Sequence, residues 1–238
     1  MIARLLDFLW PRTCEACARP VDRPGRYFCA DCLNRVPFLP TAGACAVCGR
    51  AAEGNPHEFL CDDCAAARPA FDRAASAVRF EGAMRQMILG YKFNRHLWLL
   101  EDFVDFLDAA VRARFDAAAV DVVLPMPTTA FHRLDRGYNP CVYLARRLAK
   151  RLDRRCDERV LARQGSPRRQ SDLPADERRA NVEGTFAVRR APWVRGRTVL
   201  VVDDILTTGA TLSAAATALK AAGAARVWAA TLARSVRA

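Results

Sequence analysis

Eight of the ten cysteines lie before residue 65, and all eight occur in Cys-x-x-Cys pairs. Two successive pairs can supply four thiolates to one tetrahedral zinc ion, and such a site is coordinatively full and structural. The pairs form a first quartet and a second quartet: Cys14, Cys17, Cys29 and Cys32, then Cys45, Cys48, Cys61 and Cys64. This clustering favours metal binding in a reducing compartment over disulfides. We therefore predict two structural zinc sites, and the spacing leaves open whether the quartets are sequential or interleaved.

The spacing is nearly the same in the two quartets, with eleven and then twelve residues between the pairs, so this segment contains an internal repeat. Residues 11–70 otherwise contain few long periodic segments, so they cannot build much hydrophobic core without a cross-link such as a bound metal ion. Zinc binding worth about 10–16 kcal/mol would make the folding of the segment metal-dependent. We predict a zinc-ribbon-like module over residues 1–70 and a second domain over residues 71–238.

From residue 71 onward, strand patterns alternate with helix patterns. We expect strands over residues 74–80, 121–124, 198–202 and 226–232, and helices over residues 84–93, 97–115, 139–152 and 209–222. This alternation predicts an α/β fold with a mostly parallel sheet and helices on both faces. In such a sheet, ligands bind beyond the carboxyl ends of the strands.

Two further features bear on the cellular setting. The apolar stripe in residues 1–10 is too short to span a bilayer and lacks a cleavage site, so we expect a short amphipathic helix, no stable membrane insertion and a cytoplasmic protein. The formal net charge is +11, and nearly all of it comes from arginine. A compositional bias explains that charge as well as an anionic partner does, and charge alone does not choose between them.

The most informative stretch is residues 199–211, VLVVDDILTTGAT. An apolar strand ends where Asp203 and Asp204 emerge, and two adjacent carboxylates repel each other unless hydroxyls, a cation or water satisfies them. A turn of small residues then opens a helix: Thr207, Thr208, Gly209, Ala210 and Thr211. Free backbone N–H groups and the helix dipole favour an anion there. A ligand that places a phosphate on the turn and neighbouring hydroxyl groups against the two carboxylates corresponds to a ribose 5-phosphate.

The alternative interpretation of this stretch is an ordinary strand followed by an Asp-rich N-cap region, which would need neither paired acids nor three threonines around a glycine. The loop lacks the lysine of a P-loop and does not match Gly-x-Gly-x-x-Gly. Nucleotide hydrolysis and dinucleotide binding are therefore poor fits.

Residues 199–211 closely resemble the phosphoribosyl pyrophosphate signature of type I phosphoribosyltransferases, and the whole chain resembles the ComF family. Further matching pieces are LLDFLWPRTCEAC near the start, Tyr91-Lys92-Phe93, LPMPTTAFHRLDRGYN, and scattered later residues: Arg168, Gln170, Ser171, Leu173, Glu177, Arg178, Asn181, Phe186, Val194, Arg195 and Gly196. One departure is Pro140, because the family usually has a polar residue such as Gln at this position. Proline suits the first turn of a helix, so we expect the loss of a ligand contact rather than a change of fold.

The resemblance implies a pocket for phosphoribosyl pyrophosphate and Mg²⁺, in which Asp203 and Asp204 are the catalytic acids. It also implies that the loop after residue 124 lies against the pyrophosphate, where the local donors are Thr128, Thr129, Arg133 and Arg136; Lys92 is a further candidate ligand. Magnesium would bridge pyrophosphate oxygens, and catalysis would rest on positioning and electrostatic stabilisation. Residues 165–181, with Arg168, Arg169 and Arg178, are the candidate lid; a solvated charged loop is the alternative.

Three functions remain open at this point. The first is a magnesium-dependent phosphoribosyltransferase with an acceptor that the sequence does not identify. The second is a non-catalytic adaptor for single-stranded DNA, because the resemblance implies a role in competence alongside DNA-uptake or helicase proteins; the basic charge and the aromatics Tyr91, Phe93 and Trp98 are compatible with it. The third is a purely structural zinc scaffold for protein partners.

Overall fold

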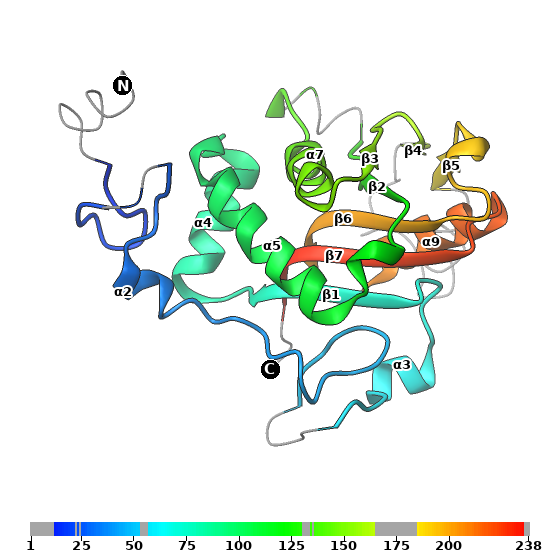
Figure 1. The fold of residues 1–238 in the computed structure, drawn as a ribbon, viewed down its shortest axis with the longest axis horizontal. Coiled ribbons are helices and arrows are strands. Elements are labelled where there is room, and N and C mark those ends of the chain that lie inside the picture. The colour runs from blue at the N-terminus through cyan, green and yellow to red at the C-terminus, as the bar shows by residue number, and fades with distance from the viewer. Residues whose placement is uncertain are drawn as a thin grey trace, which may run out of the picture.

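The computed structural model describes residues 12–21, 23, 25–52, 57–129, 134, 136–164 and 185–235. Its centre is a five-stranded parallel sheet in the order β1-β7-β6-β2-β3. The strands are β1 (Arg73–Arg79), β2 (Val122–Pro125), β3 (Arg155–Cys156), β6 (Thr198–Leu206) and β7 (Arg226–Arg234). The predicted mostly parallel α/β sheet is confirmed, and the strand order places β6 at its centre (Figure 1).

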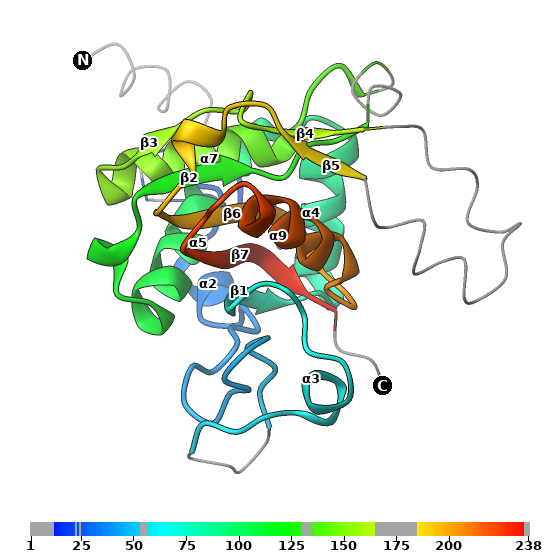
Figure 2. The ribbon, with the colours of Figure 1, turned by 90° about the vertical axis from the view of Figure 1, so that its right-hand side faces the viewer.

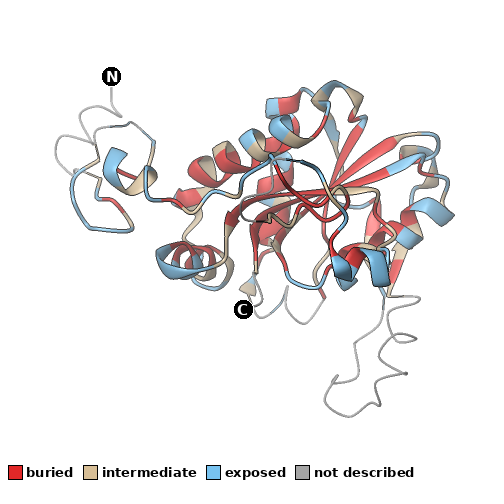
Figure 3. Cartoon of the chain, turned by 90° about the horizontal axis from the view of Figure 1, so that it is seen from below, coloured by how far each residue is buried: buried red, intermediate tan, exposed pale blue. Residues whose placement is uncertain are grey.

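Helices cover both faces of this sheet, as the alternating pattern predicted. Side chains of α4 (Gly82–Phe93), α5 (Leu100–Arg114) and α7 (Pro140–Leu152) share one buried cluster with Leu200 and Val202. Side chains of α9 (Ala210–Ala221) share the opposite cluster with Val199 and Val201. Successive residues of β6 thus face opposite layers, which explains why the strand is apolar throughout these positions. Figure 3 shows the buried strands between helices whose outer surfaces are exposed.

Short elements complete the domain. Three short 3₁₀ helices lie in the connections between the described elements: η1 (Leu97–Leu99), η2 (Ala117–Ala119) and η4 (Ala191–Trp193). The sequence pattern did not reveal β3 or an antiparallel hairpin, β4 (Leu161–Arg163) with β5 (Phe186–Val188), because two or three residues carry too little periodicity. Figure 2 shows this hairpin above α9, at the edge of the sheet formed by β2 and β3. The proposed helix over residues 1–10 and the proposed lid over residues 165–181 lie outside the described residues.

One boundary was predicted wrongly in a way that matters for the site. The apolar pattern placed the end of the strand at Val202, whereas β6 continues to Leu206. The reason is that β7 pairs alongside it to the end, with Leu206 opposite Arg234. On the other side β2 stops at Pro125, opposite Val202. The acids therefore lie within a strand that extends beyond its β2 neighbour.

The cysteine-rich segment wraps around β1 in two parts. The first part, with α2 (Ala30–Leu33), lies at one end of the molecule, and the second, with α3 (Asp62–Ala66), lies below β1 in Figure 1. The backbone N–H of Leu39 donates to Ala77 O at 3.0 Å, and that of Ala74 donates to Val47 O at 2.7 Å. These bonds cover the outer edge of β1, which would otherwise present unpaired backbone groups.

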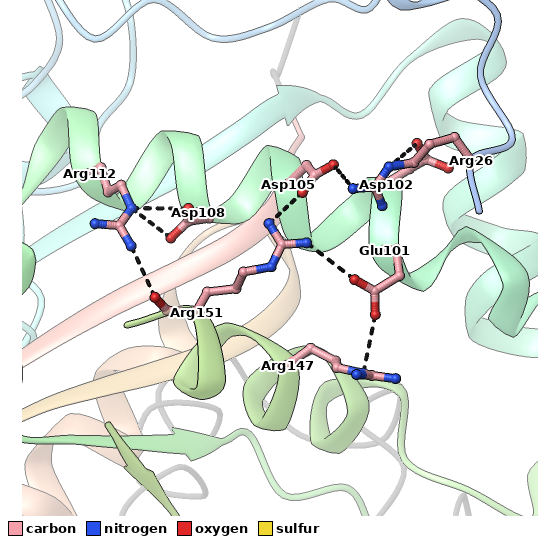
Figure 4. A network of polar contacts seen from close by, with 8 residues as sticks. All are labelled: Arg26, Glu101, Asp102, Asp105, Asp108, Arg112, Arg147 and Arg151. Carbon is pink, nitrogen blue, oxygen red and sulfur yellow. Dashed lines mark hydrogen bonds and ion pairs between the residues drawn. The ribbon is translucent and has the colours of Figure 1, made fainter. Parts of the chain in front are cut away.

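The first cysteine-rich part is joined to α5 by charged contacts (Figure 4). The Tyr27 N–H donates to Asp102 at 2.8 Å, and Arg26 pairs with Asp105 at 2.6 Å. Burial raises the pKa of Asp102, while the Tyr27 N–H and Arg26 oppose that rise. Arg151 of α7 reaches the same acidic face of α5 and contacts Asp105 at 2.5 Å. Helix α5 therefore connects the N-terminal segment to α7.

Candidate functional site

The eight predicted zinc ligands gather into two separate groups. Sulfur atoms of the first quartet lie within 4.8 Å of one another, and so do those of the second quartet. The quartets are therefore sequential rather than interleaved. Within the described part of the chain, each group consists of four cysteines, a donor set that suits a closed, structural zinc site.

The second quartet is built into the sheet domain. Its cysteines belong to the buried cluster that contains Phe71 and Ala74. The side chain of Arg234, at the end of β7, is 5 % exposed and donates to the carbonyl oxygen of Cys48 at 2.6 Å and to its sulfur at 3.4 Å. Arg114 of α5 donates to the carbonyl oxygen of Cys45. Two guanidinium groups thus supply positive charge beside a cluster that would carry net negative charge with zinc bound.

A cavity of about 390 Å³ opens beyond the carboxyl end of β6. Seven predicted ligand-binding or catalytic positions line it: Lys92, Thr128, Arg136, Asp203, Asp204, Thr207 and Thr211. The other members of the predicted loop, Thr208, Gly209 and Ala210, form the turn without lining the cavity. Arg133 lies outside the described residues. The cavity is open, so the described side chains do not fill the place predicted for a ligand.

The two acids at this cavity differ in their partners. Asp204 is 6 % exposed and pairs with Lys92 at 2.7 Å. Asp203 accepts from the Cys141 thiol at 3.4 Å and from the Asp204 N–H at 2.9 Å. Loss of hydration raises the pKa of Asp203 to about 7, and the charge of Asp204 acts in the same direction. The same burial raises the pKa of Cys141 well above its usual value, so the thiol stays protonated as a donor.

The turn after β6 has the geometry of an anion site. Gly209 precedes α9 with φ of +82°, a conformation that side chains rarely adopt, and a Cβ there would also lie 3.4 Å from Phe71. The first helical bond is donated by Ser213 to the Gly209 carbonyl at 2.8 Å. The Ala210 N–H donates to the Thr208 hydroxyl at 3.4 Å, and the N–H groups of Thr211 and Leu212 are those that a helix start leaves for another acceptor.

Two arginines that line this cavity, Arg136 and Arg163, each have a buried donor atom without a partner in the described part of the chain. Arg136 stacks over Phe93, with its guanidinium carbon 4.4 Å from the ring centre. Among the described residues, the buried Nε atoms of Arg136 and Arg163 have no hydrogen-bond partner. Sequence reasoning missed Arg163, because β4 is too short to show a pattern. Burial lowers the pKa of Arg163, opposed by the charge of Asp203, which indicates a cation that an anionic ligand would stabilise.

The departure at Pro140 leaves the fold intact, as expected. Pro140 begins α7, and the Asn139 side chain caps the helix by accepting from the Cys141 N–H at 3.1 Å. The Tyr91 hydroxyl donates to the Pro140 carbonyl at 3.0 Å. Of the three aromatics considered for nucleic acid, Tyr91 is fully buried, whereas Phe93 and Trp98 are exposed. Tyr91 therefore serves the core.

The raised pKa of Asp203 leads to a prediction about stability without ligand. A carboxyl whose pKa is higher in the folded than in the unfolded state makes the protein less stable as pH rises from about 4 to about 7. The Asp203→Asn variant lacks this loss, so its thermal midpoint relative to the parent should rise by roughly 3–6 °C between pH 5.5 and pH 8. Calorimetric melting at both pH values measures this. Asp108→Asn, outside the cavity, is the control, and an equal pH response in both variants would refute the assignment.

Comparison with known proteins bears on both halves of the chain. The double zinc ribbon domain matches residues 5–65, and the phosphoribosyl transferase domain matches residues 139–237. Competence protein F of Haemophilus influenzae is 25% identical over 192 residues, which cover 78% of this chain and 80% of that protein. These matches support assignment to the ComF family. DNA utilization protein YhgH of Escherichia coli O6:H1 is 28% identical over 211 residues, covering 82% of this chain and 92% of YhgH.

The ComF assignment rests on these two domain matches and on the curated relatives. The purine phosphoribosyltransferase from Pyrococcus horikoshii Ot3 has 19% identity, a TM-score of 0.38, and coverage of 58% of this chain and 74% of its own. A structural similarity this weak does not contribute to the family assignment. Among the described helices of this ComF protein, none is long and apolar enough to cross a membrane.

Proposed function

We propose that this ComF-family protein binds phosphoribosyl pyrophosphate, or a similar ribose 5-phosphate ligand, in the cavity at the end of β6. One observation carries the proposal: Asp203, Asp204, Thr207 and Thr211 line the same open cavity. The turn and the N–H groups at the start of α9 would hold the 5-phosphate. The acids would accept hydrogen bonds from the ribose hydroxyls, which offers Asp203 a partner for its ionised form.

The residues on the other side of the cavity suit the pyrophosphate. Arg136 and Arg163 offer planar donors that match phosphate oxygens, and Lys92 adds a point charge beside Asp204. The thiol of Cys141 lies within 4.8 Å of both acids, and a thiol is a poor ligand for Mg²⁺, which prefers oxygen. Magnesium would therefore enter with the pyrophosphate and bind through its oxygens and water. It would neutralise charge on the pyrophosphate there.

The cellular role that we infer is the handling of DNA or its nucleotides in the cytoplasm. The relatives are named for competence and for DNA utilization, and the chain carries a net charge of +11. Partners would then include single-stranded DNA and DNA-uptake or helicase proteins. Transfer of the pentosyl group to an acceptor would make the protein an enzyme, by electrostatic stabilisation of a cation-like sugar. The boundary between the zinc module and this domain, at residue 70, remains a prediction.

Calorimetric titration with phosphoribosyl pyrophosphate and MgCl₂ tests the binding proposal. We expect saturable binding by the full-length, zinc-loaded protein. Thr207→Ala with Thr211→Ala should weaken it at least tenfold, and Asp203→Asn with Asp204→Asn should do the same, because each pair removes hydrogen bonds to a charged or polyhydroxyl group, each worth about 1.5–3 kcal/mol when charged. Thr217→Ala, on α9 but outside the cavity, should bind like the parent. Absence of binding by the parent, or equal binding by all variants, would reject the proposal.

The second candidate function is a non-catalytic adaptor for single-stranded DNA. The observation that favours it is Phe93, which is 50 % exposed beside Arg136 and so presents an aromatic ring and a cation next to the cavity. Such pairs bind nucleic acid strands with little sequence preference. An adaptor predicts salt-dependent binding of oligo(dT) that Arg136→Ala weakens, without pyrophosphate release from phosphoribosyl pyrophosphate. Pyrophosphate release with any tested acceptor would favour the enzyme.

A further inference from the structure

A second cavity, of about 630 Å³, lies beside the first. It is bounded by the end of β2, the first turns of α7, the segment before β4, and β4 itself. The two cavities share the rim residues Pro127, Thr128, Asn139 and Arg163. The second cavity therefore continues from the candidate pyrophosphate side of the first without containing the acids or the threonine turn.

The charge of this second cavity is strongly positive. Among the described residues, four arginines line it, Arg146, Arg159, Arg163 and Arg189, against a single acid, Glu158. Glu158 pairs with Arg146 at 3.3 Å. The described residues that line this cavity therefore offer no second carboxylate to Arg159, Arg163 or Arg189. Arg163 additionally has a buried Nε with no partner within the described ranges. A pocket of this composition selects an anion with several oxygens, such as a phosphate.

The same cavity also presents an aromatic ring. Tyr138 is buried and its hydroxyl donates to the carbonyl of Tyr91, so Tyr138 belongs to the framework. Tyr143 is 38 % exposed and meets Tyr138 edge-on, with the ring centres 6.1 Å apart. This contact orients Tyr143 while leaving part of its ring open to the cavity. A flat ring beside phosphate-binding arginines is the combination that binds a base and its phosphate.

We propose that this second cavity binds a nucleotide unit, with its base against Tyr143 and its phosphate on Arg159 and Arg189. The volume lies within the range of small-molecule sites, about 300–1,000 Å³, and can hold a nucleotide. The inference goes beyond the proposed function, because Tyr143, Arg159 and Arg189 do not line the first cavity. The nucleotide can be a free mononucleotide or one residue of a single strand, since both present the same base and phosphate.

The test compares charge-matched variants of the full-length, zinc-loaded protein. Binding of thymidine 5′-monophosphate is measured by calorimetry and binding of a ten-residue oligo(dT) by fluorescence anisotropy. Tyr143→Ala should weaken binding about tenfold, whereas Tyr143→Phe, which keeps the ring, should bind like the parent. Arg159→Ala with Arg189→Ala should also weaken binding about tenfold. The control is Arg112→Ala with Arg147→Ala, two exposed arginines outside both cavities, which removes the same charge.

The outcomes separate the sources and the two proposals. If the Tyr143→Ala and Arg159→Ala/Arg189→Ala variants bind both probes more weakly, the site accepts a free nucleotide. If they bind only oligo(dT) more weakly, the site accepts a nucleotide within a single strand. Either result supports the inference. The inference is overturned if neither probe binds, if Tyr143→Ala binds like the parent, or if the two arginine pairs reduce affinity equally. Thermal melting of each variant confirms that it is folded. Titration of the same variants with phosphoribosyl pyrophosphate should match the parent, so failure of the first cavity is detected independently.

Discussion

Replacing Cys48 by serine should abolish the stable fold, whereas replacing Cys17 by serine should leave the sheet domain folded. Cys48 is 6 % exposed and belongs to the buried cluster of the sheet, while Cys17 is exposed. Structural zinc contributes about 10–16 kcal/mol in small zinc domains, which equals or exceeds the total stability of a typical domain, about 5–15 kcal/mol. Loss of the second zinc would also uncover the edge of β1.

Zinc content and thermal melting measure this difference. The parent should contain two zinc ions per chain. We expect the Cys17→Ser variant to contain one and to melt cooperatively within about 10 °C of the parent, and the Cys48→Ser variant to lack a cooperative transition. A chelator should likewise remove zinc from the parent in two steps, with the first quartet losing its ion first. Equal losses of stability in the two variants would show that the second quartet is not integral to the sheet domain.

Replacing Arg234 by methionine should destabilise the protein by about 3–5 kcal/mol, the cost typical of removing one member of a buried charged pair. Arg234 is buried at the end of β7 and donates to both the carbonyl oxygen and the sulfur of Cys48. Methionine fills a similar volume but leaves that carbonyl without its donor and the thiolates without the positive charge. The melting temperature should fall by about 6–20 °C.

Arg226→Met is the matched control, because Arg226 is exposed at the other end of the same strand. Besides melting, the rate of zinc loss to a chelator should rise at least tenfold in the Arg234 variant and stay unchanged in the control. Because Ser235, the next residue, lines the first cavity, ligand binding should weaken in step with zinc loss. If Arg234→Met retains zinc as firmly as the parent, the guanidinium does not stabilise the thiolate cluster.

The cysteine spacing determined the number and kind of metal sites, because a zinc site with four thiolate ligands needs little more than two Cys-x-x-Cys pairs. It could not determine the pairing of the quartets, which depends on where the chain folds back. It also gave no sign that the second quartet packs on the sheet. That depends on Arg234 and Arg114, which lie far along the chain from the cysteines they contact.

Residues 199–211 also divide into a part that the sequence indicated and a part that depended on folding. Residues 199–211 indicated a strand, two acids and a turn from local chemistry alone, and the structure places Asp203, Asp204, Thr207 and Thr211 at one cavity. The true end of β6 depended on pairing with β7, a separate strand that follows α9 in the chain. The sequence offered Lys92 as a candidate ligand, but its partner Asp204 became visible only after folding.

By itself the sequence determined the order of the main strands and helices, the two cysteine quartets, and the acids and turn of residues 199–211, since each depends on periodicity or spacing over a few neighbouring residues. The tertiary structure alone decided which strands are neighbours, which cysteines share an ion, and that Arg163 and Tyr143 line a second cavity beside the first. The physical reason is that these features arise from contacts between segments far apart in the chain, and such contacts leave no local pattern in the sequence.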